Sequence, residues 1–123
     1  MEKPKTMRID DVEYVRKDSV SLEQAQKLDG LKYCMIRTYS AGVFAGYLKE
    51  INGKVGTVLQ ARRIYYWDGA ASLSQLATDG TSKPENCKFP CEVTEVILTE
   101  IIEVIPCTEK ARLSIKGVKV WKK

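Results

Sequence analysis

Apolar and polar positions alternate most regularly in the first half of the chain. Three segments rich in β-branched and aromatic residues follow one another at residues 32–39, 43–51 and 54–63. The pair Asn52-Gly53 separates the second segment from the third, and Asn-Gly between β-forming segments is a strong hairpin signal. The pattern therefore predicts an antiparallel meander of three strands.

Helical periodicity is restricted to short segments. The predicted helices cover residues 22–28, 73–79 and 109–115. Ser21 and Ser72 each precede a Gln at capping-box spacing, and Thr108 can cap the third helix. Glycine follows each helix, at positions 30, 80 and 117. We therefore expect two or three short helices.

The remaining segments complete an α+β prediction. Residues 61–67 continue as a fourth or bent strand, and the long apolar segment 92–105 is expected to form the central strand, covered on both faces or bent by a bulge. Further expected elements are a hairpin at 7–16, a loop at 80–90 and a terminal strand at 118–121. The predicted fold is a mostly antiparallel twisted sheet or a partly open small barrel.

One compact domain suits a chain of 123 residues. Within it, residues 1–30 would form the N-terminal ribbon and helix. Residues 31–123 would hold the main sheet, the 80–90 loop, and the C-terminal helix and strand. No apolar segment of the roughly 18 residues that suggest a membrane span occurs, and charges in residues 1–10 argue against a signal peptide. We therefore expect a cytoplasmic protein that has no membrane partner.

The absence of histidine narrows the chemistry. Histidine is the commonest general base and a frequent zinc ligand, so its absence argues against most hydrolases. We expect no enzyme activity, no catalytic residue and no cofactor. The four cysteines, Cys34, Cys87, Cys91 and Cys107, have spacing that fits a zinc site poorly, so we expect no metal and predict buried, reduced thiols.

The excess of basic residues is mild. Twenty Lys and Arg against 16 Asp and Glu give a formal charge of +4, which is low for a duplex-DNA-binding protein but compatible with small anionic ligands.

Two arginines, one isoleucine and three aromatic residues follow one another in the segment 62–67. Alternation along a strand would place Arg63, Tyr65 and Trp67 on one face, and Arg62 and Tyr66 on the other. Guanidinium groups pair with phosphates and aromatic rings stack on bases, so either face could hold a nucleotide. An amphipathic strand that packs its aromatic rings into the core explains the same pattern.

Two weaker candidates for anion binding lie elsewhere. Arg37 ends the first predicted strand, where backbone groups come free, and Ser72 opens a helix whose first amides lack partners. A solvated charge at Arg37 and an ordinary helix cap at Ser72 are the simpler interpretations.

Three stretches of the sequence, at residues 33–48, 61–89 and 104–122, resemble the first type of Thoeris anti-defence family of phage and prophage proteins. The block WDGAASLSQLA is the most distinctive part. The resemblance implies a sponge that captures, without cleaving it, the glycocyclic ADP-ribose signal made by TIR-domain enzymes in the infected bacterial host. It also implies a homodimer, in some cases a trimer of dimers, and in some members separate sites for cyclic oligonucleotides.

On this resemblance we assign ligand roles from residue chemistry. Arg62 and Arg63 would hold the pyrophosphate, and one of Tyr65, Trp67 or Phe89 would stack on the base. Asn86 would contact the base or ribose, and residues 80–89 would form a lid. Arg112 would reach the pocket of a neighbouring subunit.

Two other functions remain open at this point. A small module that binds single-stranded nucleic acid would also use arginine and aromatic residues, although we expect no nucleic acid partner. The third hypothesis is an enzyme that degrades nucleotide signals.

Overall fold

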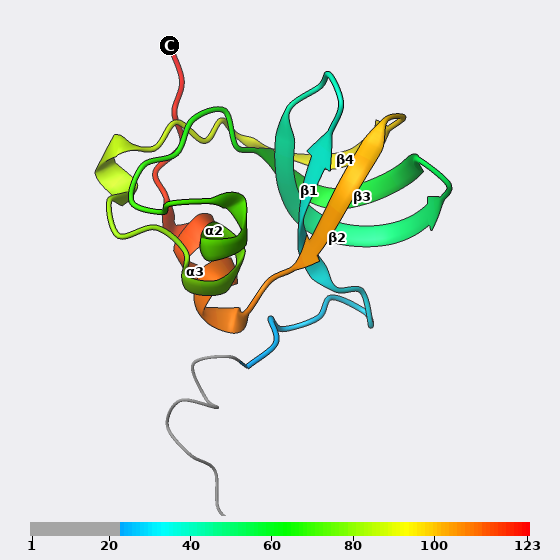
Figure 1. The fold of residues 1–123 in the computed structure, drawn as a ribbon, viewed down its shortest axis with the longest axis horizontal. Coiled ribbons are helices and arrows are strands. Elements are labelled where there is room, and N and C mark those ends of the chain that lie inside the picture. The colour runs from blue at the N-terminus through cyan, green and yellow to red at the C-terminus, as the bar shows by residue number, and fades with distance from the viewer. Residues whose placement is uncertain (1–22) are drawn as a thin grey trace, which may run out of the picture.

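The structure is a computed structural model that describes residues 23–123. It has an α+β fold, as predicted, with one antiparallel five-stranded sheet (Figure 1). The strands are β1 (Tyr33–Thr38), β2 (Val43–Asn52), β3 (Val55–Arg63), β4 (Glu92–Leu98) and β5 (Ile101–Pro106). The helices are α2 (Leu73–Asp79) and α3 (Glu109–Gly117), with a 3-10 turn, η1, at Pro84–Asn86. The predicted hairpin at residues 7–16 lies outside the described residues.

The predicted meander of β1, β2 and β3 is confirmed. Each strand pairs antiparallel with the next, and the β2–β3 hairpin turns at Asn52-Gly53, where Gly53 has a φ of 64°. The β2–β3 register shifts between Ala45 and Tyr47, and Gln60 on the facing strand has a φ of 50°. Such bulges increase the local bend of a sheet.

The prediction of one long central strand over residues 92–105 is wrong. The segment forms two strands, β4 and β5, at opposite edges of a sheet whose order is β4-β3-β2-β1-β5. Only Thr99 and Glu100 join them, so the sheet must curl until its two edges approach one another at this end. The result is a partly open barrel. Its interior is filled by seven buried residues: Cys34, Ile36, Phe44, Val58, Ala61, Leu98 and Ile101.

Helices α2 and α3 lie side by side at one side of the sheet (Figure 1). Their predicted caps are confirmed, because the Ser72 hydroxyl accepts from the Gln75 amide and the Thr108 hydroxyl accepts from the Ala111 amide. Thr108 also donates its hydroxyl to the Thr78 carbonyl at 2.6 Å. A second apolar core, which includes Leu76 and Ile115, fills the space between the helices and the sheet.

The helix predicted at residues 22–28 is absent from the described part of that segment. The amide of Ala25 donates to the Cys107 carbonyl at 3.1 Å, and Leu28 exchanges two backbone hydrogen bonds with Leu31 across a turn. Backbone partners from elsewhere in the fold therefore replace the helical hydrogen bonds.

Two further strand predictions are wrong. β3 ends at Arg63, so residues 64–67 leave the sheet, and the only bridge in that segment joins Tyr66 to Lys88. The predicted strand at 118–121 is reduced to a single bridge between Val120 and Phe89. Both segments lie next to residues 87–89, which supply their backbone partners.

Three of the four thiols, those of Cys34, Cys87 and Cys107, are buried and free, as predicted. The prediction fails for Cys91, which is exposed and lies in the link between Pro90 and β4. No helix within residues 23–123 has the length and apolar character needed to cross a membrane.

Gly80 tests the contact between the two helices. Its φ of 75° and ψ of −158° belong to a conformation that is essentially restricted to glycine, and an added Cβ would lie 2.3 Å from the Ser114 Cβ. We expect Gly80→Ala to reduce the free energy of unfolding by about 2–4 kcal/mol in urea denaturation.

Gly53→Ala is the matched control, because Gly53 also has a positive φ but an added Cβ there would meet no other atom within 4 Å. It should lose only about 1 kcal/mol. Equal losses in the two variants would contradict the close helix contact at Gly80.

Candidate functional site

Arg62, which the sequence suggested as a phosphate ligand, is buried, with 4% of its surface exposed. Its guanidinium donates four hydrogen bonds of 2.7–3.1 Å to backbone carbonyls. The acceptors are the carbonyls of Phe89, Pro90, Ile115 and Val118. Burial lowers the pKa of the guanidinium, but arginine stays charged at neutral pH. Arg62 therefore binds its own chain and cannot offer the pyrophosphate fork that we expected.

Phe89, one of three candidates for base stacking, is fully buried. The Arg62 guanidinium carbon lies 5.5 Å from the centre of its ring. Because no ring face reaches solvent, the assignment of Phe89 as a stacking ring is corrected to a core position.

The other members of the 62–67 segment diverge because the chain leaves the sheet after Arg63. Arg63 is exposed, lies over the Phe44 ring at 4.3 Å and donates to the Ala41 carbonyl. Trp67 turns inward, and its indole N–H donates to the Ala70 carbonyl at 3.3 Å. Tyr65 points outward, with 64% of its surface exposed. The expected common face of these three residues is therefore not formed.

Three other predicted ligand residues have partners within the chain. Arg37 pairs with Glu103 at 2.9 Å, and the Ser72 hydroxyl caps α2. The Asn86 side-chain amide donates to the Asp68 carboxylate at 3.0 Å, which lowers the pKa of Asp68. Movement of residues 80–89 as a lid would have to break this contact.

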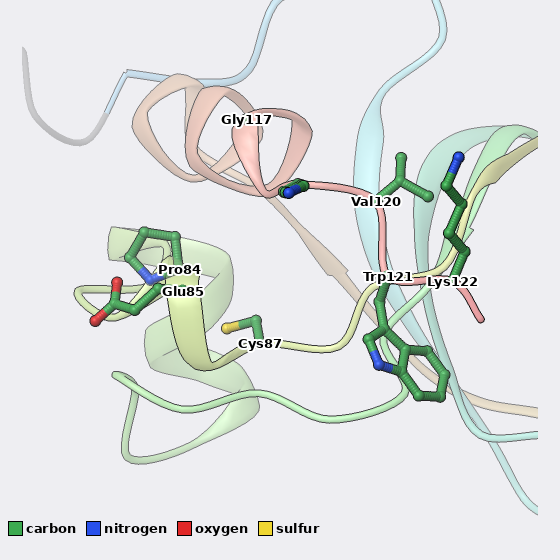
Figure 2. A pocket seen from close by; sticks show the side chains of 8 residues that line it. Pro84, Glu85, Cys87, Gly117, Val120, Trp121 and Lys122 are labelled. Atoms are coloured by element: carbon green, nitrogen blue, oxygen red, sulfur yellow. The ribbon is translucent and has the colours of Figure 1, made fainter.

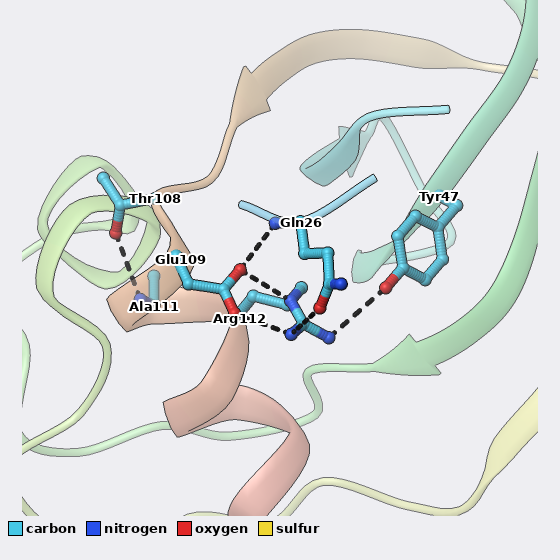
Figure 3. A network of polar contacts seen from close by, with 6 residues as sticks. All are labelled: Gln26, Tyr47, Thr108, Glu109, Ala111 and Arg112. Atoms are coloured by element: carbon cyan, nitrogen blue, oxygen red, sulfur yellow. Dashed lines mark hydrogen bonds and ion pairs between the residues drawn. The ribbon is translucent and has the colours of Figure 1, made fainter. Parts of the chain in front are cut away.

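Arg112 lies in a polar network that joins α3 to β2 and to the segment before β1 (Figure 3). It makes two hydrogen bonds with the Glu109 carboxylate, at 2.9 and 2.7 Å, and contacts the Tyr47 hydroxyl at 3.4 Å and Gln26 at 3.2 Å. These bonds hold the guanidinium against its own chain, so the prediction that it reaches a neighbouring subunit gains no support.

Three exposed side chains and one half-buried ring with ligand-binding chemistry gather instead around the segment that follows α3. The rings of Tyr65 and Trp121 stack, with centroids 5.3 Å apart and planes 5° apart. The Lys88 ammonium lies 5.7 Å from the Trp121 ring and 5.8 Å from the ring of Tyr66, which is 51% exposed. We call Tyr65, Tyr66, Lys88 and Trp121 the aromatic–lysine cluster.

Backbone contacts between three segments position the aromatic–lysine cluster. Tyr66 and Lys88 exchange backbone hydrogen bonds of 3.2 and 2.8 Å, which hold the segment after β3 beside the segment after the η1 turn. The Trp121 amide donates to the Phe89 carbonyl at 3.0 Å, which holds the segment after α3 against the same residues. The cluster therefore combines residues that are more than 50 positions apart in the sequence.

A cavity of about 680 Å³ borders Trp121. It lies between the η1 turn and the segment that follows α3, and its lining residues are Pro84, Glu85, Cys87, Gly117, Lys119, Val120, Trp121 and Lys122. Figure 2 shows Pro84 and Glu85 at one side of the cavity, Trp121 at the other and Cys87 between them. An aromatic ring, two ammonium groups and a carboxylate are thus available around one open space.

Sequence reasoning missed Lys88 and Trp121. Two signals were present, an isolated tryptophan and three lysines within residues 119–123, but the alternation there indicated an ordinary strand. Nothing in the sequence links this terminal segment to Tyr65. Within residues 23–123, no group of three Cys, Asp or Glu side chains is arranged to hold a metal ion.

The Glu109–Arg112 pair predicts an acid-dependent loss of stability. Hydrogen bonds from Arg112 and from the Gln26 amide lower the pKa of Glu109 from 4.5 to about 2. The ionised carboxylate therefore stabilises the fold above pH 4.5, and this contribution disappears as the pH falls through 2. Glu109→Gln should flatten the decline of Tm between pH 4.5 and 2 and lower Tm at pH 7.

Glu50→Gln is the control, since Glu50 is exposed and has no ion pair with a described residue. Its Tm profile should follow the wild type. A Glu109→Gln profile parallel to the wild type would contradict a role for this pair in stability.

Comparison with known proteins identifies a family but no characterised relative. No match is found among curated proteins or among solved structures. A family model covers residues 31–115, from just before β1 into α3, and this range includes Arg62, Tyr65 and Lys88 but not Trp121. Since the match extends over more than half of the chain, the protein belongs to the family described as a domain of unknown function, DUF6948.

Proposed function

We propose that this protein binds a small nucleotide and holds it without cleaving it. The observation that carries the proposal is the stack of the exposed Tyr65 ring on the half-buried Trp121 ring, with the Lys88 ammonium beside it. A nucleotide combines a flat base with phosphate charge, and the aromatic–lysine cluster offers a partner for each. The adjoining cavity of about 680 Å³ has the size typical of small-molecule sites.

The ligand class we propose is a cyclic ADP-ribose signal. Such a molecule has a base for Trp121, a pyrophosphate for Lys88 or Lys119, and ribose hydroxyls that a carboxylate such as Glu85 could accept from. The sequence resemblance to the Thoeris anti-defence family supports the same ligand, and with it a role as a phage sponge in the cytoplasm of an infected bacterium.

Sequestration is favoured over turnover by the side chains available. The chain has no histidine, and the residues that line the cavity include a single carboxylate and no hydroxyl group. A pair of acid and base groups, or an activated nucleophile, is the usual requirement for cleavage of a nucleotide.

Substitutions in the aromatic–lysine cluster test the site. Trp121→Leu and Lys88→Gln should each weaken binding of cyclic ADP-ribose about 10- to 100-fold in isothermal titration calorimetry, which corresponds to one lost stack or one lost charged contact. Tyr39→Leu is the control, because Tyr39 is 78% exposed but lies at the β1–β2 turn. It should bind as the wild type does.

The same titrations separate the alternative functions. A protein that tracks single-stranded nucleic acid loses affinity steeply with salt, whereas a pocket for one dianion changes modestly. Ligand recovered intact by mass spectrometry after prolonged incubation supports sequestration. Accumulation of a cleaved product, or no binding of any cyclic nucleotide by the wild type, would refute the proposal.

We also propose a homodimer as the smallest assembly. Exposed apolar side chains on both edge strands, such as Ile97 and Ile102, provide surface that a second copy could cover. Light scattering at micromolar concentration should therefore give a mass of at least twice 13.9 kDa. A monomer at all concentrations would contradict this proposal without affecting the ligand site.

A further inference from the structure

We propose that Arg62 is a positioning residue for the nucleotide site, because its buried guanidinium holds both segments that carry Lys88 and Trp121. This inference rests on the proposed function. Arg62 has no surface to offer a ligand, so its effect on binding would be exerted through the two backbone segments that it joins.

The first segment follows Lys88 directly. Arg62 donates to the Phe89 carbonyl at 3.1 Å and to the Pro90 carbonyl at 2.9 Å. The Phe89 carbonyl also accepts the Trp121 amide at 3.0 Å, so this one oxygen accepts hydrogen bonds from both Arg62 and Trp121. A shift of this carbonyl would move Lys88 and Trp121 together.

The second segment is the end of α3. Arg62 donates to the carbonyls of Ile115 and Val118, at 2.8 and 2.7 Å. The Ile115 carbonyl also accepts the Val118 amide at 3.3 Å, and a cation at a helix C-terminus interacts favourably with the helix dipole. Val118 lies three residues before Trp121, so these bonds set the direction in which the terminal segment leaves the helix.

The geometry requires arginine in particular. Four acceptors on two segments surround one planar group, and the guanidinium has five N–H donors in a fixed arrangement. Lysine would retain the charge but has three donors on one nitrogen, which cannot reach four carbonyls in these directions. Arg62→Lys therefore preserves the charge but loses some of the four hydrogen bonds to the backbone carbonyls.

The test separates positioning from stability. In a Trp67→Phe background, Trp121 is the only tryptophan, so its fluorescence anisotropy reports on the terminal segment. At a temperature well below Tm, Arg62→Lys should lower this anisotropy and weaken cyclic ADP-ribose binding at least 10-fold.

Val58→Ala is the matched control, because Val58 is fully buried inside the barrel, away from the aromatic–lysine cluster. It should lower Tm by a similar amount or more, with affinity within twofold of the wild type and unchanged anisotropy. If Arg62→Lys changes affinity and anisotropy no more than Val58→Ala does, Arg62 is only structural and the inference is overturned.

Two further outcomes are distinguishable. If the wild type binds no cyclic ADP-ribose, the proposed function fails, and the anisotropy of Trp121 still decides whether Arg62 positions this segment. If Arg62→Lys does not fold, NMR of the wild type decides instead. Saturating cyclic ADP-ribose should shift the Arg62 Nε–H signal together with the Trp121 amide signal, and an unshifted Arg62 signal would overturn the inference.

Discussion

The buried guanidinium of Arg62 is the interaction on which the arrangement of this protein most depends. It is the point where the end of β3, the segment before β4 and the end of α3 meet. A buried cation is costly unless it is hydrogen-bonded, and here the guanidinium donates to four backbone carbonyls. One residue thus links the barrel to both segments that surround the proposed site.

The short link between β4 and β5 is the second constraint. Strands at opposite edges of a flat sheet could not be joined by Thr99 and Glu100 alone, so the sheet has to curl. The interior of the curled sheet holds one apolar core, and the helices cover a second core outside it. The aromatic residues of the proposed site lie on the irregular segments beside the barrel.

The proposed site lies on irregular segments and not on the strands of the barrel. Tyr65, Lys88 and Trp121 lie on segments held by single bridges and by Arg62, and they do not belong to regular strands. Binding groups on loops supported by a scaffold are common in proteins, because loops can present side chains that a sheet would bury. The proposal of nucleotide capture depends on the side chains that these segments present.

Local patterns in the sequence were sufficient for some elements but not for the helix expected at 22–28, where backbone partners from elsewhere in the fold replace the helical hydrogen bonds. The Asn52-Gly53 hairpin and the caps at Ser72 and Thr108 depend on residues within a few positions of one another, and all three are confirmed. The site was not predictable in this way. The partners of Arg62 and the stacking of Tyr65 on Trp121 depend on contacts between segments that are distant in the sequence. Only the tertiary structure decides these contacts, because burial and hydrogen-bond partners are properties of the packed chain.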